Sequence, residues 1–180
     1  MAPLRTIRLA ILRTAAGVVM AALVTTTPAS AQVSDLAVKA AFIPKFARYV
    51  TWPPSAAERT GAQVVICIIG DDPFGNALNQ AAGGQQVDGR PYVVKRLSSA
   101  VGANDCAIAF IDGSRTGEIL AALGRLPVLT ITDGSSQRGV IHFTIADGRV
   151  RFFIDNAQAQ ARGLTISSRL LALAIGVTQK

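Results

Sequence analysis

Apolar residues along the chain follow two spacings, and their alternation predicts strands separated by helices. Continuous and mostly β-branched runs predict strands at residues 63–69, 92–94, 107–111 and 128–131. Helical spacing of apolar residues predicts short helices after Pro73 and between Gly113 and Gly124. The first run is apolar at nearly every position, as is typical of a strand covered on both faces of a parallel sheet. The pattern therefore predicts an α/β domain with a largely parallel sheet flanked by helices.

Before the first strand, apolar residues between Leu36 and Val50 recur near the 3.6-residue spacing of a helix. Ser34 precedes them and can accept a hydrogen bond from the first free backbone amides, which predicts the start of the helix. Pro44 lies within the run and is expected to kink the helix, because proline has no backbone N–H to donate. The helix is expected to end at Trp52, which two prolines follow.

The C-terminal part predicts a hairpin and a helix. Asp147-Gly148 separates the runs 140–145 and 150–154 and is a strong signal for a two-residue hairpin turn. The predicted register places Ile141, Phe143, Ile145, Val150, Phe152 and Ile154 on one face, and His142, Thr144, Arg149 and Arg151 on the other. Apolar residues after Ser167 predict a C-terminal helix that covers the sheet. Since no internal repeat or linker separates these elements, we expect a single domain.

The first 31 residues have a composition of their own. Their only charged residues are three arginines, and an apolar run at 15–24 and the sequence Ala29-Ser30-Ala31 follow them. This order is typical of a secretory signal peptide, so we expect residues 1–31 to be removed from a mature domain at 32–180. The apolar run is shorter than the roughly 20 residues that span a bilayer, so we expect an exported mature chain without a transmembrane span.

Composition and charge exclude several classes of function. Hydrophobic residues make up 50% of the chain and charged residues 16%, which excludes a disordered chain. The formal net charge of +7 falls to +4 once the three N-terminal arginines are removed. The remaining cations are spread between Lys39 and Lys180 and do not form a stripe with aromatic residues, so we expect no nucleic-acid partner.

The mature domain contains two cysteines, Cys67 and Cys106, and one histidine, His142. This set is too small for a zinc site, and we expect no metal and no cofactor. An exported protein meets an oxidising compartment, so the thiols are expected to form one disulfide, with two buried free thiols as the alternative. Cys67 lies in the first predicted strand and Cys106 opens the third, and these strands are neighbours in a flavodoxin-like sheet.

No motif for catalysis or nucleotide binding is complete. The loop at 134–138 lacks the second glycine of a Gly-x-Ser-x-Gly nucleophile elbow. Asp71 and Asp72 follow the first strand, where a Gly-x-Gly-x-x-Gly turn would bind phosphate, and we interpret them as caps of the next helix. A hydrolase would have to use His142 as its base, and the strand pattern predicts a half-exposed polar residue there. We therefore expect no catalytic residue.

Two groups of residues are candidates for binding a ligand or a partner. His142, Arg149 and Arg151 share the polar face of the hairpin and could bind an anion, although charges also protect an exposed sheet edge. At the end of the first helix, Trp52 could line a small apolar pocket or pack in the core. The full set of candidate ligand or interface residues is Tyr49, Trp52, His142, Arg149, Arg151 and Arg169.

Several segments, in order along the mature chain, resemble the YfiR family of periplasmic regulators. They include Tyr49-Val50-Thr51-Trp52-Pro53 and Gly70-Asp71-Asp72-Pro73-Phe74-Gly75. The resemblance implies a small periplasmic α/β protein, often dimeric, that is not an enzyme. The resembling segments are 38–42, 45–53, 66–75, 128–133, 150–155 and 163–171.

The resemblance also implies a partner. A member of the family restrains a membrane-bound diguanylate cyclase by binding its periplasmic domain, and its disulfide state affects this restraint. Cys67 and Cys106 occupy the positions of one family disulfide, and this sequence has no second cysteine pair. We therefore expect a regulator of cyclic di-GMP signalling that binds a membrane protein and forms a homodimer. A periplasmic module that binds an aromatic or anionic small molecule near Trp52 or Arg151 is the alternative.

Overall fold

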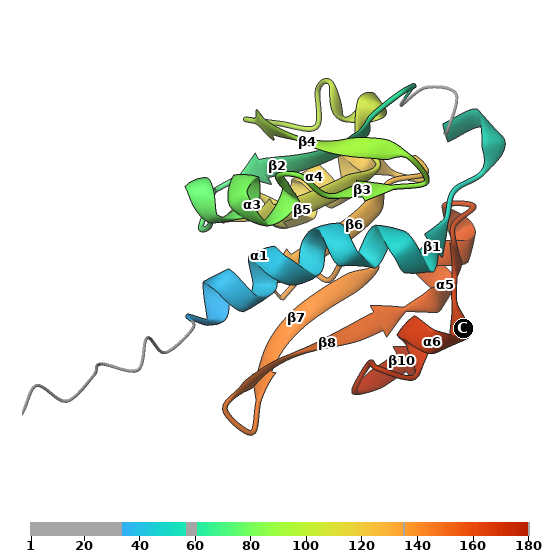
Figure 1. Ribbon diagram of the computed structural model, residues 1–180. Coiled ribbons are helices and arrows are strands. Elements are labelled where there is room, and N and C mark those ends of the chain that lie inside the picture. Colours follow the sequence, from blue (N-terminus) through green and yellow to red (C-terminus); the bar gives the residue numbers. More distant parts are fainter. Residues whose placement is uncertain (1–33, 57–60, 135, 180) are drawn as a thin grey trace, which may run out of the picture. The chain divides into compact units, whose positions relative to one another are not determined.

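The centre of the protein is a mixed sheet of eight strands, seen in a computed structural model that describes residues 34–56, 61–134 and 136–179 (Figure 1). The order across the sheet is β10-β8-β7-β6-β5-β2-β4-β3. The expected signal peptide at 1–31 lies outside the described residues. The strands are β2 (Val64–Gly70), β3 (Gln86–Val87), β4 (Arg90–Leu97), β5 (Ile108–Asp112), β6 (Leu129–Asp133), β7 (Ile141–Ala146), β8 (Arg149–Asp155) and β10 (Gly176–Thr178).

The middle of the sheet is parallel. β4, β2, β5, β6 and β7 run in the same direction, whereas β8 is antiparallel to β7 and β3 is antiparallel to β4. The edge strand β10 pairs with β8 in parallel. The order of the five parallel strands is flavodoxin-like, so the first and third predicted strands are neighbours as expected. The predicted fold class, a single α/β domain with a mostly parallel sheet and a C-terminal hairpin, is confirmed.

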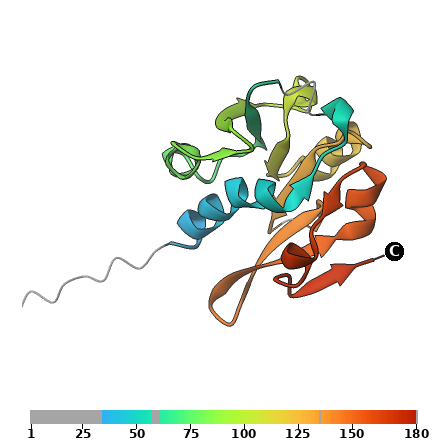
Figure 2. The same ribbon diagram turned by 45° about the vertical axis from the view of Figure 1, so that its right-hand side comes forward.

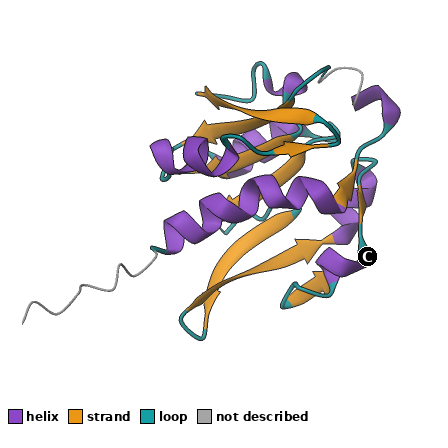
Figure 3. Cartoon of the chain, in the orientation of Figure 1, coloured by secondary structure: helices purple, strands orange, loops and turns teal. Residues whose placement is uncertain are grey.

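Helices cover both faces of this sheet (Figures 2 and 3). On one face, α1 and α3 contribute residues such as Ile43 and Leu78 to a core shared with the strand residue Phe110. On the other face, Leu123 of α4 packs with Ile111 of β5. The helices and 3-10 turns are α1 (Asp35–Phe46), η1 (Ala47–Tyr49), α3 (Asn76–Ala82), η2 (Ala103–Asp105), α4 (Thr116–Leu123), α5 (Asn156–Ala161) and α6 (Ser168–Leu171).

The first helix begins where the sequence predicts and ends earlier. The Ser34 side chain accepts a hydrogen bond from the Ala37 backbone N–H at 3.2 Å, which caps α1. The helix continues through Pro44 and then tightens into η1. It does not reach Trp52, because the β-branched pair β1 (Val50–Thr51) instead forms an antiparallel ladder with β9 (Thr165–Ile166).

Two local features near β2 differ from the sequence prediction. The helix after Pro73 begins only at Asn76, because the Asp72 carboxylate accepts hydrogen bonds from the Phe74 and Gly75 backbone amides at 2.8 and 3.1 Å. Those bonds hold a turn in which Gly75 has a positive φ of +51°, which glycine adopts without a Cβ clash. Asp72 therefore stabilises the loop before the helix instead of capping the helix itself.

The hairpin β3–β4 was not predicted. Asp88 and Gly89 form its turn with φ angles of 51° and 75°, and β4 extends on both sides of the predicted strand at 92–94. The Asp-Gly pair is the same signal that correctly predicts the turn at Asp147-Gly148. In that second hairpin Phe143 lies opposite Phe152, so the predicted register of β7 and β8 is confirmed.

The predicted C-terminal helix begins at Ser168 behind its Ser167 cap and packs Leu170 into the core, but it is shorter than the apolar spacing predicts. The helix α6 spans only Ser168–Leu171, and the chain then forms the edge strand β10. The backbone N–H of Ile175 donates to the Phe152 carbonyl at 3.0 Å, so pairing with β8 satisfies backbone groups that a longer helix would have paired internally.

The helix α5 after β8 was not expected from the sequence. The Asp155 side chain caps it by accepting from the Gln158 backbone N–H at 2.8 Å.

Across the described ranges, none of the helices combines the length and the apolar character needed to cross a membrane.

Candidate functional site

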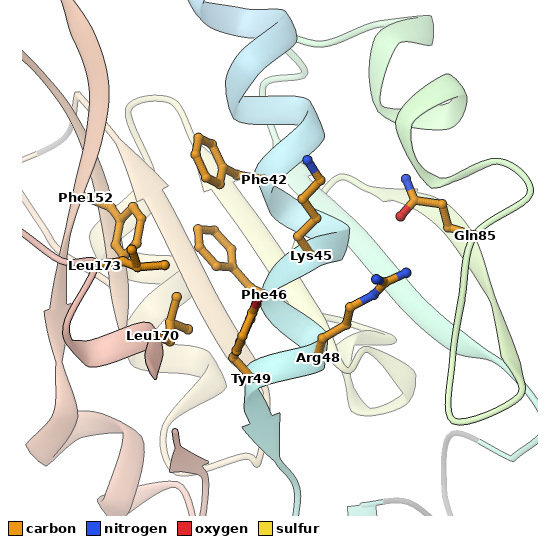
Figure 4. Close-up of a pocket in the computed structure, with 9 residues that line it drawn as sticks. All are labelled: Phe42, Lys45, Phe46, Arg48, Tyr49, Gln85, Phe152, Leu170 and Leu173. Carbon is orange, nitrogen blue, oxygen red and sulfur yellow. The ribbon is translucent and has the colours of Figure 1, made fainter. Parts of the chain in front are cut away.

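A concave surface lies between α1 and the segment around α6 (Figure 4). We call it the α1–α6 groove, and its volume is about 190 Å³. In Figure 4 the cations and Gln85 lie on one side, and Phe152 and the two leucines lie on the other. The groove is lined by Phe42, Lys45, Phe46, Arg48, Tyr49, Gln85, Phe152, Leu170 and Leu173.

The floor of the groove is a cluster of three phenylalanine rings. Phe42 and Phe46 are four residues apart on α1, so they share one face of the helix, and their ring centroids are 5.9 Å apart. Phe152 of β8 meets Phe46 edge-to-face at 5.2 Å and Phe42 at 6.1 Å. Because Phe46 and Phe152 are buried, the floor is fixed by the domain core and does not depend on a ligand.

Two cations form one rim of the groove. Lys45 and Arg48 are exposed, and neither forms a salt bridge within 4.0 Å in the described part of the chain. None of the nine described lining residues is acidic. The groove therefore combines an aromatic floor with uncompensated positive charge, which suits an apolar group that carries a carboxylate or other anion.

The structure separates the two aromatic candidates. Tyr49 lines the α1–α6 groove, whereas Trp52 lies outside it. The Trp52 indole N–H donates to the Ala107 carbonyl at 3.2 Å, and its ring packs against the core. Trp52 therefore holds the end of the first helical segment against β5 and does not line this groove. Arg169 is exposed on α6 next to Leu170, but it is not among the lining residues.

The three hairpin candidates for binding an anion do not form one cluster. His142 is only 7% exposed, not half-exposed, and lies opposite Phe153. Arg149 lies opposite Ala146, four residues along β7 from His142, which corresponds to about 13 Å. Arg151 lies between these two levels, opposite Thr144. The polar face exists as predicted, but the buried His142 does not share an exposed anion site with Arg149.

His142 is held by a structural hydrogen bond. Its Nδ1 lies 2.9 Å from the Thr132 hydroxyl oxygen, which also accepts from the Gly139 backbone N–H at 3.0 Å. Burial lowers the pKa of His142, the positive charges of Arg138 and Lys39 lower it further, and Asp133 opposes this effect. Thr132 is fully buried, so this pair links β6, β7 and their connecting loop and is closed to a substrate.

Cys67 and Cys106 form the disulfide that the sequence predicts, with a Cα–Cα distance of 5.8 Å. The two residues are 0% and 2% exposed, so the bond lies inside the core between the sheet and η2. In the sheet register Cys67 lies opposite Ala109. Cys106 therefore reaches Cys67 from the end of η2, not from a directly opposed position in β5.

A second crevice lies at the carboxyl ends of β2, β4 and β5, where doubly wound sheets commonly bind ligands. Asp71, Asp112 and Arg115 line it, and Arg115 donates to the Ser98 carbonyl at 2.6 Å. The nearby Asp72 pairs with Arg96 at 2.8 Å. Among the residues that the structure describes, no group of three or more His, Cys, Asp or Glu residues could hold a metal ion.

Comparisons with known proteins give a family. A comparison with curated proteins yields no match. The sequence profile of the YfiR/HmsC-like family matches residues 36–175, which leave out only the first residue of α1 and the edge strand β10 among the elements described above. Members of this family are periplasmic and regulate cyclic di-GMP signalling instead of catalysing a reaction. The protein belongs to the YfiR/HmsC-like family.

Proposed function

We propose that this protein is exported to the periplasm and restrains a membrane-bound diguanylate cyclase by binding the periplasmic domain of that enzyme. The family match over residues 36–175 carries the proposal. The protein acts by binding and performs no chemistry of its own. In this proposal residues 1–31 direct export and are removed, and the mature chain works as a homodimer.

Restraint by binding requires two states of the cyclase with different affinity for the regulator, because a binder shifts an equilibrium only by that difference. The regulator favours the inactive state, and cyclic di-GMP rises when the regulator is lost. Reduction of Cys67–Cys106 would release the cyclase, because the disulfide ties β2 to η2 and its loss would loosen the face of the sheet under α4.

The test is a deletion strain in which cyclic di-GMP is measured after complementation. We expect deletion to raise cyclic di-GMP, and wild type and His142→Gln to lower it equally. The double variant Cys67→Ser with Cys106→Ser should restrain less at equal protein level. A deletion that leaves cyclic di-GMP unchanged contradicts the proposed function. Full restraint by a well-accumulated double variant contradicts only the redox part.

The oligomeric part of the proposal has its own measurement. Light scattering of the purified mature protein should give the mass of two chains. A monomer at micromolar concentration would remove the homodimer from the proposal and leave the regulatory function in place.

A small-molecule binding function is the second candidate, and the α1–α6 groove is the observation that favours it. Its aromatic floor and the cations Lys45 and Arg48 suit a small aromatic carboxylate. Calorimetry with a panel of aromatic amino acids and aryl acetates tests this function directly. Binding that Arg48→Gln weakens would support it, and no heat from any member of the panel would contradict it.

A further inference from the structure

We infer that the α1–α6 groove is the docking surface for the partner, and that it receives an amphipathic helix with acidic residues beside its apolar face. This inference rests on the proposed function, because it names the surface through which the restraint acts. Its support comes from the apolar surface, the charge and the dimensions of the groove.

The apolar surface of the groove continues onto exposed residues. Leu173 forms one wall and is 60% exposed. Ile175, 45% exposed, bonds through its backbone N–H to the Phe152 carbonyl and so lies beside the floor at the sheet edge. Large apolar side chains that are exposed next to a concave apolar floor are typical of a surface that a partner covers.

The positive charge of the groove favours a partner with acidic residues. Lys45 and Arg48 project from the rim without a salt bridge in the described ranges, and no acidic residue lines the groove there. Arg169 adds a third exposed cation on α6, which supplies the opposite wall. Complementary carboxylates on a partner would therefore strengthen binding and speed association.

The charge also argues against a second copy of this chain as the occupant. In a two-fold symmetric interface the same patch meets itself. A groove-to-groove contact would bring Lys45 and Arg48 of one protomer toward the same cations of its partner, and like charges in an interface are unfavourable. The homodimer in the proposed function would therefore use another face.

The dimensions of the groove fit side chains on a helix. Its wall along the end of α1 and η1 runs from Phe42 to Tyr49, a rise of seven residue steps, which corresponds to about 10 Å, or two helical turns. Two anchors spaced i and i+4 on a partner helix fit this length. The volume of about 190 Å³ lies below the roughly 300–1,000 Å³ of typical ligand sites, so it suits two inserted side chains.

The experiment uses the strain that lacks this protein, complemented with variants of the full-length chain. The partner cyclase is identified as the one whose deletion in that strain abolishes the rise in cyclic di-GMP. Leu173→Asp and the double variant Lys45→Glu with Arg48→Glu change the groove. Val101→Asp is the matched control for the first, because Val101 is 85% exposed in a loop outside the groove. Lys95→Glu with Arg125→Glu is the control for the second, since it makes the same change in net charge at exposed positions outside the groove.

We expect both groove variants to lose restraint at wild-type protein level and both controls to retain it. With the purified periplasmic domain of that cyclase, Leu173→Asp should weaken binding by about tenfold or more. Raising the salt concentration should weaken wild-type binding, and should affect the Lys45→Glu, Arg48→Glu variant less. Leu173→Ser serves as a milder second variant if Leu173→Asp does not accumulate.

Three outcomes overturn the inference. The first is full restraint by well-accumulated groove variants in a strain where deletion does raise cyclic di-GMP, which leaves the proposed function intact. The second is binding of the purified domain that does not depend on salt, which would show that acidic residues of the partner do not contribute to docking. The third is binding that appears only when a small aromatic carboxylate is added, which assigns the groove to a ligand. A deletion without effect instead contradicts the proposed function itself.

Discussion

Gly176 lies directly opposite Phe153 in the parallel pair of β10 and β8, and a Cβ atom at Gly176 would lie 2.9 Å from Cδ1 of the Phe153 ring. The ring therefore occupies the space that a side chain at residue 176 would need. Arg138 stacks on the same ring at 5.0 Å from its centroid. Only glycine at this position lets the C-terminal edge strand pair with β8 without displacing Phe153.

Replacing Gly176 with valine should detach this edge strand. We expect Gly176→Val to lower the free energy of unfolding by about 1–3 kcal/mol, the usual cost of overpacking. Hydrogen exchange should show faster exchange at residues 175–178. Thr178→Val in the same strand is the control and should change little, because Thr178 is exposed. Unchanged exchange in Gly176→Val would contradict the packing argument.

Loss of the disulfide should destabilise the domain without unfolding it. The bond closes a loop between residues 39 positions apart. We expect Cys67→Ala with Cys106→Ala to lower the free energy of unfolding by roughly 2–4 kcal/mol. Denaturant titration measures the loss, and wild type under reducing agent in denaturant is the matched comparison.

Mass analysis after alkylation checks the disulfide directly. Because the two cysteines are bonded to each other, alkylation in denaturant without a reducing agent should label neither of them. Two alkylated cysteines in freshly isolated protein would show that the bond is absent in the cell.

Truncating Phe46 should be one of the most costly single changes. Phe46 is 1% exposed and its ring contacts Phe42, Phe143 and Phe152. We expect Phe46→Ala to lower the free energy of unfolding by about 3–5 kcal/mol, because a large cavity would replace the ring. Leu173→Ala is the control, and at this exposed position it should leave the unfolding midpoint nearly unchanged. Equal effects of the two changes would contradict the assignment of Phe46 to the core.

His142 should make stability depend on pH. Its pKa is lowered in the folded state, mainly by burial, so the unfolded chain takes up a proton first as the pH falls. The stability from neutral His142 is complete above the unfolded pKa of about 6.5. It declines as the pH falls below that value toward the lowered pKa of the folded state.

The pH effect can be isolated because the chain has a single histidine. Urea unfolding of wild type and His142→Gln at several values between pH 7.5 and 5.5 gives the difference due to this residue. We expect the advantage of wild type to shrink as the pH falls. A constant difference across this range would show that His142 does not titrate differently in the two states.

Local patterns in the sequence were enough to predict most of the sheet. The run from Val64 to Ile69 is apolar on both faces because helices cover both sides of β2, and Asp147-Gly148 alone sets the hairpin register. The same reasoning failed after Leu171. Apolar spacing there fits a helix, but hydrogen bonds to β8 form an edge strand, and such distant pairing leaves no local signal.

The site was only partly predictable for the same reason. Tyr49 was a candidate and does line the groove, but its partner wall at Leu173 comes from the other end of the chain. Lys45 and Arg48 were missed, although their position beside Phe42 and Phe46 on one helical segment was visible in the sequence. The strand pattern alone predicted a half-exposed His142. Its burial and its hydrogen bond to Thr132 depend on how β6 and β7 pair, which the local sequence does not show.

The short ladder of β1 and β9 has a consequence for the aperture of the groove. β1 follows the wall that carries Tyr49, and β9 precedes the wall that carries Leu170. The pairing of Val50 in β1 with Ile166 in β9 therefore connects the two walls. The Ser167 backbone N–H extends this connection by donating a hydrogen bond to the Tyr49 carbonyl at 2.9 Å. This ladder is separate from the main sheet, so we expect substitutions confined to it to alter the width of the groove while the sheet stays intact.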